Sequence, residues 1–379
     1  MKLALLIYKY FPYGGQQRDF MRILQRCQQA GHDVVVYCLS WQGPQPDNIE
    51  LVIVPVKAFS RHLLYQRYTA WIQSELGKHS ADLVIGFSKM PGLDIYYAAD
   101  PCFAARMDRE NSLIKKILPR YRHFLRYEKA VLDAGSDTEI MLLSPQQQND
   151  FEEFYPGCKP RLHQLSPGID ASRLPSAEAE TERKEFRENF SLTDNDIALL
   201  QIGSGFKVKG LDRSIRAFAA LPDDIRLRSQ FYIVGQDKPG DYLKLAQSLR
   251  VADRCHFLGG REDVPLFLRG CDLLLHPAYS ESAGYTLLEA VINGLPVLTT
   301  DTCGYAFHVE RARAGEVCKS PFSQQELNNM LLSMLETLNQ RKWQQNGLAY
   351  AKQIDVAGMP DAALKLIEQV ARKKTSVLS

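Results

Sequence analysis

Two glutamates separated by seven residues, Glu281 and Glu289, are the side chains whose spacing best suggests chemistry. Glu281 follows the apolar run 273–275, which is typical of a buried strand. Glu289 lies in a predicted helix from Gly284 to Asn293, which the following Gly-Leu-Pro ends. The backbone N–H groups and the helix dipole at such a strand–helix loop favour an anion. Two carboxylates beside that anion can hold hydroxyl groups, which describes a nucleotide-sugar site.

A second candidate site is the loop 203–212, rich in glycine and lysine, between a predicted strand and a predicted helix. Glycines such as Gly203 let the backbone approach a phosphate, and Lys207 and Lys209 supply positive charge. The loop has neither the Gly-Lys-Ser/Thr of a P-loop nor the glycine spacing of a dinucleotide-binding turn. It is either a phosphate-binding loop or an ordinary turn with solvated lysines, and the glutamate pair favours the first interpretation.

The third candidate is the turn that contains Gly14 and Gly15, after the first predicted strand. The turn opens a helix, which places it at the ligand-binding edge of the first unit. Asp19 follows in that helix. It is either a surface acid in the first turn, favoured by the helix dipole, or a carboxylate on the acceptor side of a site.

Short apolar runs alternate with helical patterns along the chain, which predicts an α/β fold with parallel sheets. The expected strands are 3–8, 34–39, 51–54, 83–87, 139–143, 198–203, 231–234, 256–258, 273–276 and 297–300, and the expected helices include 16–30, 211–221, 241–250 and 360–373. A polar stretch after Gly168 interrupts the alternation, which then restarts. We therefore expect two Rossmann-like units, 1–168 and 169–355, followed by a last helical segment, 356–379.

The composition narrows the class of protein. A net charge of +2 over 379 residues argues against a general nucleic-acid binder. The eight cysteines show no CxxC spacing, and several that lie in apolar runs are expected to be buried free thiols of a reducing cytoplasm. The eight histidines show no metal-ligand spacing, so no metal site is predicted. Asp194-Asn195-Asp196 matches a metal-diphosphate motif, but its place before a strand favours a turn.

The segment 106–129 carries eight basic and three acidic residues, interleaved with apolar ones. Such a basic amphipathic segment can lie on an anionic lipid surface. The alternative is a helix whose apolar face packs on its own domain while its basic face meets an anionic substrate.

The segment 281–297, the loop 203–210 and the hinge 167–170 resemble the second domain of retaining GT-B glycosyltransferases. The resemblance extends over nearly the whole chain and is most specific to the lipopolysaccharide core glucosyltransferases. The motifs that carry this second resemblance are 8–20, Lys89–Asp94 and Cys303–Tyr305. It implies two Rossmann-like domains that face a cleft, with a final helix that crosses back to the first domain.

The resemblance also implies an activity: retaining transfer of glucose from UDP-glucose to an inner-core heptose, in α-1,3 linkage, with no metal required. Glu289 is then expected to hold the ribose hydroxyls, Lys209 to face the diphosphate, and Glu281 to lie near the donor sugar. Backbone N–H groups from Ala283 through Gly284 to Tyr285 are expected to meet sugar and phosphate.

In the first domain, the resemblance implies that Gly14 and Gly15 close over the donor. We expect the catalytic residues to be Glu281, Lys209 and Asp19. The enzyme is expected to be cytoplasmic, peripheral on the cytoplasmic face of the inner membrane, with segment 106–129 against the anionic surface.

The sequence departs from the wider family pattern at several positions. Ser282 and Ala283 stand in a loop that usually reads Glu-Gly-Phe-Gly, and Cys303 stands where glycine is common. Ser204 stands where many relatives carry an arginine, so Lys207 or Arg261 is expected to supply that charge. Three alternatives therefore stay open: another UDP-sugar glycosyltransferase with a lipid-linked acceptor, a UDP-sugar epimerase, or a catalytically silent GT-B binding protein.

Overall fold

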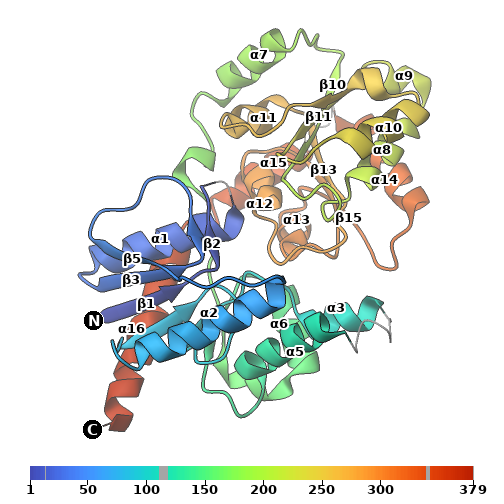
Figure 1. The fold of residues 1–379 in the computed structure, drawn as a ribbon. Coiled ribbons are helices and arrows are strands. Elements are labelled where there is room, and N and C mark those ends of the chain that lie inside the picture. Colours follow the sequence, from blue (N-terminus) through green and yellow to red (C-terminus); the bar gives the residue numbers. More distant parts are fainter. Residues whose placement is uncertain (13, 111–117, 339–341, 379) are drawn as a thin grey trace. The chain divides into compact units, whose positions relative to one another are not determined.

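The computed structural model describes residues 1–12, 14–110, 118–338 and 342–378. They form two compact units. The first unit consists of residues 1–168 and the C-terminal segment that starts at Ala357, and the second unit is Ile169–Val356. The sequence had placed the corresponding boundaries at 168 and 355. Each unit is drawn in Figure 1 and is described by itself below.

A seven-stranded parallel sheet with the order β5-β3-β1-β6-β7-β8-β9 forms the centre of the first unit. The strands are β1 (Lys2–Leu6), β3 (Asp33–Cys38), β5 (Ile49–Ile53), β6 (Leu83–Gly86), β7 (Ile95–Tyr97), β8 (Glu139–Leu142) and β9 (Leu162–Gln164). Two further short strands, β2 (Lys9–Tyr10) and β4 (Ser40–Trp41), pair with each other. The sequence missed β2, β4, β7 and β9, because two or three residues are too few to show a periodic pattern.

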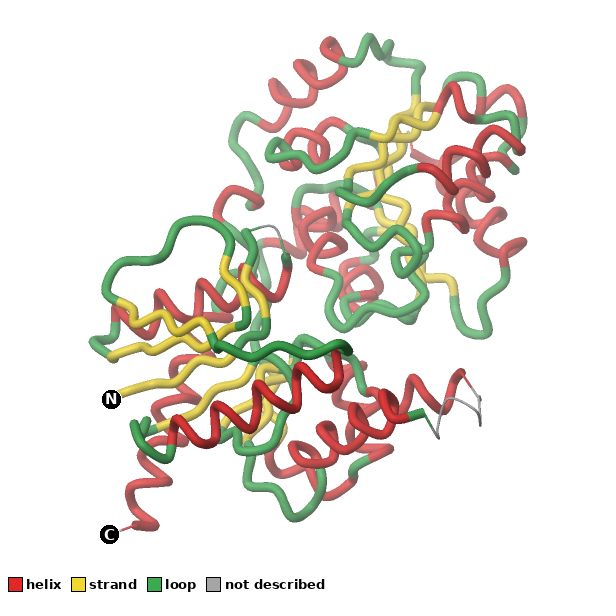
Figure 2. The backbone as a smooth tube through the Cα atoms, in the orientation of Figure 1, coloured by secondary structure: helices red, strands yellow, loops and turns green. Residues whose placement is uncertain are grey.

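Helices lie on both sides of this sheet (Figure 2). On one side, buried side chains of α2 (Arg61–Leu76), α5 (Pro119–Leu132) and α6 (Pro145–Phe154) pack on alternate residues of the strands. On the other side, α1 (Gly15–Gln29) packs on β3, and the last helix, α16 (Met359–Leu378), packs against α1. The Lys374 ammonium, 2.8 Å from the Asp94 carboxylate, joins α16 to the loop before β7. The unit also contains α3 (Phe103–Glu110) and the 3-10 helix η1 (Pro156–Arg161).

A six-stranded parallel sheet with the order β12-β11-β10-β13-β14-β15 forms the centre of the second unit. The strands are β10 (Ile197–Ile202), β11 (Ser229–Val234), β12 (Cys255–Phe257), β13 (Leu273–His276), β14 (Val297–Thr300) and β15 (Gly315–Cys318). One face is buried under α8 (Leu211–Ala219), α10 (Gly240–Ser248) and α14 (Gln324–Thr337). The remaining helices are α7 (Ala179–Asn189), α9 (Asp223–Arg226), α11 (Val264–Gly270), α12 (Tyr285–Ile292), α13 (Ala306–Ala312) and α15 (Lys342–Ala351), with the 3-10 turns η2 (Ala171–Arg173) and η3 (Ala252–Arg254).

The predicted α/β class with parallel sheets is confirmed, and each of the ten expected strands is present within a few residues. The sequence missed β15, whose Gly315 and Glu316 interrupt the apolar run. All eight cysteines are buried free thiols, whereas the sequence predicted this for several of them. Among the described residues no helix has the length and apolar character needed to span a bilayer.

The sheet topology positions the candidate residues of the second unit. Strands β10, β13 and β14 are neighbours, so their carboxyl ends lie side by side. Loop 203–210 leaves β10, and the loop with Glu281 leaves β13. Gly210 begins α8 in the left-handed conformation, with φ 68°, and a Cβ there would lie 2.1 Å from the Pro277 carbonyl oxygen. The two loops therefore touch through a position that only glycine fits.

We predict that Gly210→Ala destabilises the second unit more than Gly259→Ala does. Both glycines have φ 68°, but nothing lies within 4 Å of a Cβ at Gly259. Gly259→Ala should therefore lower the free energy of unfolding only by the strain of a left-handed alanine, about 1–2 kcal/mol. Gly210→Ala should cost a further 1–3 kcal/mol, roughly, from its overlap with the Pro277 carbonyl. Equal losses in chemical denaturation would contradict this close approach.

Candidate functional site

A chain of three charged or polar side chains joins the two loops of the second unit. Lys209 lies on the loop after β10, and its ammonium is ion-paired with one carboxylate oxygen of Glu281. The other oxygen accepts a hydrogen bond from His276 Nε2 at 2.8 Å. His276, the last residue of β13, is fully buried. Gln201 fixes the Lys209 backbone by donating a hydrogen bond of 2.9 Å to its carbonyl oxygen. The structure thus brings Lys209 and Glu281 together. Their expected places at the diphosphate and the donor sugar stay predictions.

The loop that carries Glu281 is held along its length by the loop after β14. Glu281 N–H donates to the Thr302 carbonyl at 3.0 Å, and Gly304 N–H donates to the Glu281 carbonyl at 2.9 Å. Tyr305 N–H donates to the Ala283 carbonyl at 2.6 Å. The Cys303–Tyr305 motif therefore acts as a backbone support for the glutamate loop.

The Glu281 carboxylate is held in its charged form. Burial by itself would raise the pKa of Glu281, but the Lys209 ammonium and the hydrogen bond from His276 outweigh that effect and hold its pKa well below the ordinary value of 4.5. Only 17% of the Glu281 side chain and 19% of the Lys209 side chain are exposed, so solvent screens their attraction weakly. The charged carboxylate therefore fixes the position of the Lys209 ammonium at the carboxyl edge of the sheet.

Ligand atoms of His276, Glu281 and Cys303 lie within 4.8 Å of one another, a grouping that the sequence spacing did not reveal. The Lys209 ammonium already neutralises the Glu281 carboxylate. Burial raises the pKa of the Cys303 thiol to about 11, so the sulfur stays protonated near neutral pH. The grouping therefore serves as an ion-paired network around Lys209.

Glu289 lies on α12, with 4% of its surface exposed. Its carboxylate is ion-paired with Arg173 at 3.2 Å, and Asn293 Nδ2 donates hydrogen bonds of 2.8 Å to the carbonyl oxygens of Arg173 and Glu289. Sequence reasoning missed Arg173, which lies in the polar stretch after the hinge, where no periodic pattern marks a residue as buried. The pair orients Glu289 from the segment that begins the second unit.

The N-terminus of α12 starts directly after Gly284, in the left-handed conformation with φ 95°. No side chain caps this end of the helix, and its first turn contains no acidic residue. Ala283 is buried, and Tyr285 is the first helical residue. The structure thus places Ala283, Gly284 and Tyr285 at a helix start beside Glu281, where the dipole favours an anion.

The glycine-rich loop after β10 turns through Gly203 and Gly205, with φ 125° and 83°. The Asp237 carboxylate accepts hydrogen bonds from Gly205 N–H and, at 3.3 Å, from Phe206 N–H. A Cβ at Gly203 would lie 3.4 Å from Lys209 Cε, so glycine gives the lysine chain its room. Asp237, from the loop after β11, is a second contributor that the sequence reasoning missed.

The two candidates for the charge expected near Ser204 differ in their surroundings. Arg261 makes a two-pronged ion pair with Asp263, through hydrogen bonds of 2.7 and 2.6 Å. Lys207 is exposed, and no acidic group in the part of the chain that the structure describes pairs with it. The Ser204 hydroxyl accepts a hydrogen bond from Gln236 N–H at 3.1 Å. Lys207 is therefore the more available cation of the two.

In the first unit, the Gly14–Gly15 turn precedes α1, with Gly14 as its N-cap residue. A Cβ at Gly14 would overlap the Gln17 side chain, whereas one at Gly15 would meet nothing within 4 Å. Asp19 is 3% exposed and accepts a hydrogen bond of 2.7 Å from the Tyr97 hydroxyl. The interpretation of Asp19 as a surface acid is wrong, because the helix turns it into the interior. Its role on the acceptor side stays a prediction.

The described part of segment 106–129 separates into two faces. Helix α5 buries His123, Tyr127 and Glu128 in the first unit, while Arg120, Arg122, Arg126 and Lys129 are exposed. The apolar residues 113, 114 and 117 and the lysines 115 and 116 lie outside the described residues. Within α5 the apolar face therefore packs on its own unit and the exposed face is basic, while Leu118 just before the helix is exposed. The diphosphate-like motif at 194–196 forms a turn, in which Asp196 accepts two hydrogen bonds of 2.7 Å from Thr193.

Comparisons with known proteins match this architecture. Residues 182–349 match the model of glycosyl transferases group 1, and residues 13–173 match that of glycosyltransferase family 4. The chain is 43% identical over 368 residues to the lipopolysaccharide glucosyltransferase WaaG of Escherichia coli K12, covering 97% of this chain and 98% of that protein. The crystal structure of a WaaG covers 96% of this chain and 99% of its own, with a TM-score of 0.92 and 43% identity. A structure of Anabaena Alr3699/HepE in complex with UDP-glucose has a TM-score of 0.73 at 18% identity, with 97% of this chain and 100% of its own covered.

We predict that Glu281 stabilises the second unit most strongly above pH 5. Because its folded-state pKa is lowered from 4.5, its contribution is fully present above the unfolded value and is lost as the pH falls. Glu281→Gln should therefore lower the free energy of unfolding by about 1–3 kcal/mol at pH 7, the scale of leaving a charged partner unpaired. The difference from wild type should shrink between pH 5 and pH 3. The exposed Glu262→Gln is the control, and a difference independent of pH would contradict the ion pair.

Proposed function

Since the chain belongs to the glycosyltransferase family that includes the lipopolysaccharide glucosyltransferase WaaG, we propose that it transfers glucose from UDP-glucose to a heptose of a lipopolysaccharide core, with retention. The observation that carries this proposal is the 43% identity over nearly the full length of both chains, combined with the Lys209–Glu281–His276 network at the sheet edge. The chain has the two parallel α/β sheets of the GT-B fold. The α-1,3 linkage is part of the proposal and rests on the resemblance alone.

In this proposal Glu289 accepts hydrogen bonds from the ribose hydroxyls, while Arg173 holds its carboxylate in place. Lys209 faces the diphosphate, and Lys207 takes the place of the arginine that Ser204 lacks. The start of α12, from Ala283 to Tyr285, directs its N–H groups at sugar and phosphate. Glu281 keeps the Lys209 ammonium at a fixed position, so that it needs no reorganisation as the leaving group gains charge.

The state of Glu281 supports a front-face route. Its two oxygens are engaged by Lys209 and His276, so the carboxylate is poorly suited to attack the donor carbon and form a covalent intermediate. The bond between the donor C1 and the diphosphate oxygen breaks, and the heptose oxygen bonds to C1 on the same face. The proton of that hydroxyl passes to the departing phosphate oxygen. The positive charge of Lys209 does the electrostatic work, and we propose that the reaction needs no metal ion.

The proposed setting is the cytoplasmic face of the inner membrane, where a lipid-anchored acceptor is available. The exposed basic face of α5 supports an electrostatic contact with anionic lipid, because its apolar face is buried in the first unit. Such a contact would weaken with salt.

If the Lys209 ammonium faces the diphosphate of the donor, Lys209→Ala should lower kcat by about 100-fold or more. This is the scale of losing one preorganised charge partner. The measurement is glucose transfer from UDP-glucose to truncated lipopolysaccharide, with UDP release followed in parallel. Lys244→Ala, an exposed lysine on α10, is the matched control. Near-normal turnover of the Lys209 variant would overturn the assignment.

The same assay separates the alternatives. A transferase consumes UDP-glucose only with its acceptor, an epimerase converts UDP-glucose without one, and a silent binding protein does neither. Replacing UDP-glucose by other nucleotide sugars tests the donor.

A chelator of divalent metal ions should leave the rate of glucose transfer unchanged. Loss of activity that added divalent metal restores would refute metal independence.

The membrane contact predicts that replacing Lys115, Lys116 and Arg122 by glutamine reduces co-sedimentation with vesicles of anionic phospholipid. Each lost cation should weaken binding by about 1 kcal/mol. UDP binding should stay the same, because Glu289 and Lys209, the side chains proposed to hold the ribose and the diphosphate, lie in the other unit. Sedimentation that neither salt nor these substitutions alter would rule out this surface.

A further inference from the structure

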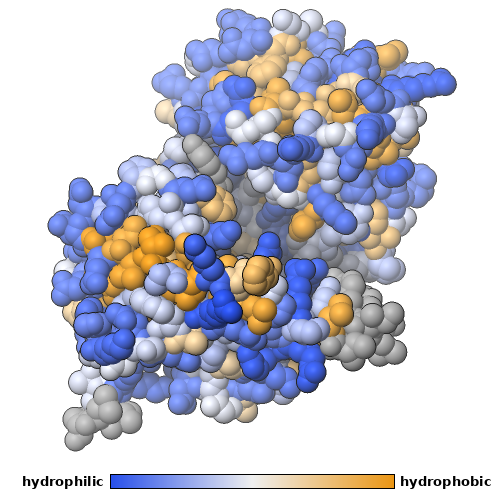
Figure 3. All heavy atoms as spheres, in the orientation of Figure 1, coloured by the Kyte–Doolittle hydropathy of each residue, from blue (hydrophilic) through white to orange (hydrophobic). Residues whose placement is uncertain are grey.

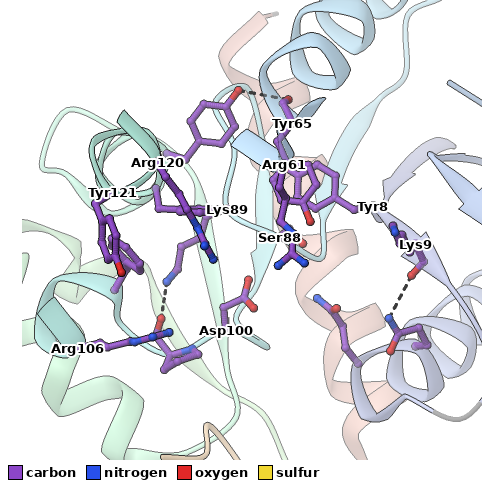
Figure 4. Close-up of a pocket in the computed structure, with 16 residues that line it drawn as sticks. Tyr8, Lys9, Arg61, Tyr65, Ser88, Lys89, Asp100, Arg106, Arg120 and Tyr121 are labelled. Atoms are coloured by element: carbon purple, nitrogen blue, oxygen red, sulfur yellow. Dashed lines mark hydrogen bonds between the residues drawn. The ribbon is translucent and has the colours of Figure 1, made fainter. Parts of the chain in front are cut away.

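The first unit contains a pocket of about 410 Å³ that the donor site does not use. It lies between the segment after β1, the start of α2, and the helices α3 and α5, and all of its lining residues belong to this unit (Figure 4). In the space-filling view the first unit also shows strongly hydrophilic side chains beside apolar ones (Figure 3). Cations and aromatic rings both line the pocket, and this combination indicates its ligand.

Cations greatly outnumber acids in the pocket wall. Lys9, Arg61, Arg106 and Arg120 line it together with Lys89, against the single carboxylate of Asp100. Figure 4 shows the basic ends of Arg61, Lys89, Arg106 and Arg120 around Asp100. Among the described residues, no acidic side chain forms an ion pair with Lys9, Arg61 or Arg120. The pocket therefore has an excess of positive charge that its own residues do not neutralise.

One wall of the pocket is built on a buried ion pair. The Glu128 side chain is fully buried and accepts hydrogen bonds from Lys89 Nζ at 2.5 Å and from the N–H groups of Phe103 and Ala104 at 2.6 and 2.8 Å. The Tyr155 hydroxyl adds a fourth donor at 3.0 Å. Glu128 thus holds both Lys89 and the first turn of α3. A carboxylate so fully satisfied fixes the wall and leaves Lys89 largely neutralised.

Aromatic rings supply the apolar part of the wall. Tyr8 and Tyr65 stack with ring centroids 3.6 Å apart, and Phe103 packs against Tyr121 and Phe124 with centroids 5.9 and 5.6 Å apart. Rings of this kind offer flat apolar surface at low entropic cost, and the Tyr hydroxyls add hydrogen-bonding ends. A ligand with flat C–H faces, hydroxyl groups and a negative charge matches this lining.

We propose that this pocket binds an anionic sugar of the acceptor, through a carboxylate or phosphate group that Arg61 and Arg120 contact, and so selects a charged core saccharide over a neutral one. The inference rests on the proposed function for its acceptor and goes beyond it in naming the binding residues and the charge that they recognise. Guanidinium groups bind both anions in the same two-pronged way, so the shared chemistry is an oxyanion with paired oxygens.

The test measures binding of deacylated, water-soluble core saccharide by calorimetry, with no donor and no lipid present. The saccharide is used in three forms: untreated, with its phosphate esters removed, and with its carboxylates reduced to alcohols. Arg61→Gln combined with Arg120→Gln should weaken binding of the untreated form by about 10- to 100-fold, the scale of lost charge-assisted hydrogen bonds. The chemical treatment that removes the recognised anion should weaken wild-type binding to the same extent and leave the variant unaffected.

Arg67→Gln combined with Arg122→Gln is the matched control, since these exposed arginines lie on the same two helices, α2 and α5, but do not line the pocket. Arg61→Lys should retain part of the affinity, which separates loss of charge from misfolding. Equal binding by wild type and the pocket variant, or wild-type binding unaffected by both treatments, would overturn the proposal. Glucose transfer is assayed separately: transfer without pocket-dependent binding refutes only this inference, and pocket-dependent binding without transfer refutes only the proposed function.

Discussion

The ion pair between Lys209 and Glu281 is the interaction on which the candidate site depends. It joins the loops after β10 and β13, which the sheet order places side by side. Burying two charges costs free energy unless further hydrogen bonds satisfy them, and His276 donates one to the Glu281 carboxylate. The backbone of the Thr302–Gly304 loop holds the Glu281 main chain in place. Gly210 lets the loops approach closely enough for the pair to form. The result is a cation fixed in position before any substrate binds.

The first unit uses a similar arrangement for a different purpose. Lys89 lies after β6 and pairs with Glu128 of α5, as Lys209 lies after β10 and pairs with Glu281. In the first unit the carboxylate also receives two backbone N–H groups of α3, so the pair fixes a helix and a pocket wall. Arg61 and Arg120 line the same pocket, and no acidic side chain among the described residues forms an ion pair with either. In both units a buried lysine–glutamate pair stabilises the carboxyl edge of a parallel sheet, where loops would otherwise move independently.

Much of this organisation follows from local sequence patterns. The sequence predicted β13 and β14 with their observed ends. β13 begins with three leucines, as expected because buried parallel strands need apolar residues on both faces. The sequence also predicted that the helix stops at Gly294. In the structure Gly294 adopts the left-handed conformation, with φ 75°. Partners distant in sequence were not evident. Arg173 lies 116 positions before Glu289, and Asp237 comes from a third loop, so no local pattern relates them to their partners.

The sequence by itself determined the α/β class, the parallel sheets and the types of residue at the sheet edge, because periodicity and glycine placement are local properties. Only the tertiary structure decided which of these residues meet. Asp19 is an example: its place near a helix start is equally compatible with exposure and burial, and packing of α1 on β3 turned it inward to Tyr97. Likewise Arg120 of α5 lines a pocket only because α2, α3 and the segment after the first strand come together with it. Long-range packing sets these contacts, and the chain order alone does not encode their distances.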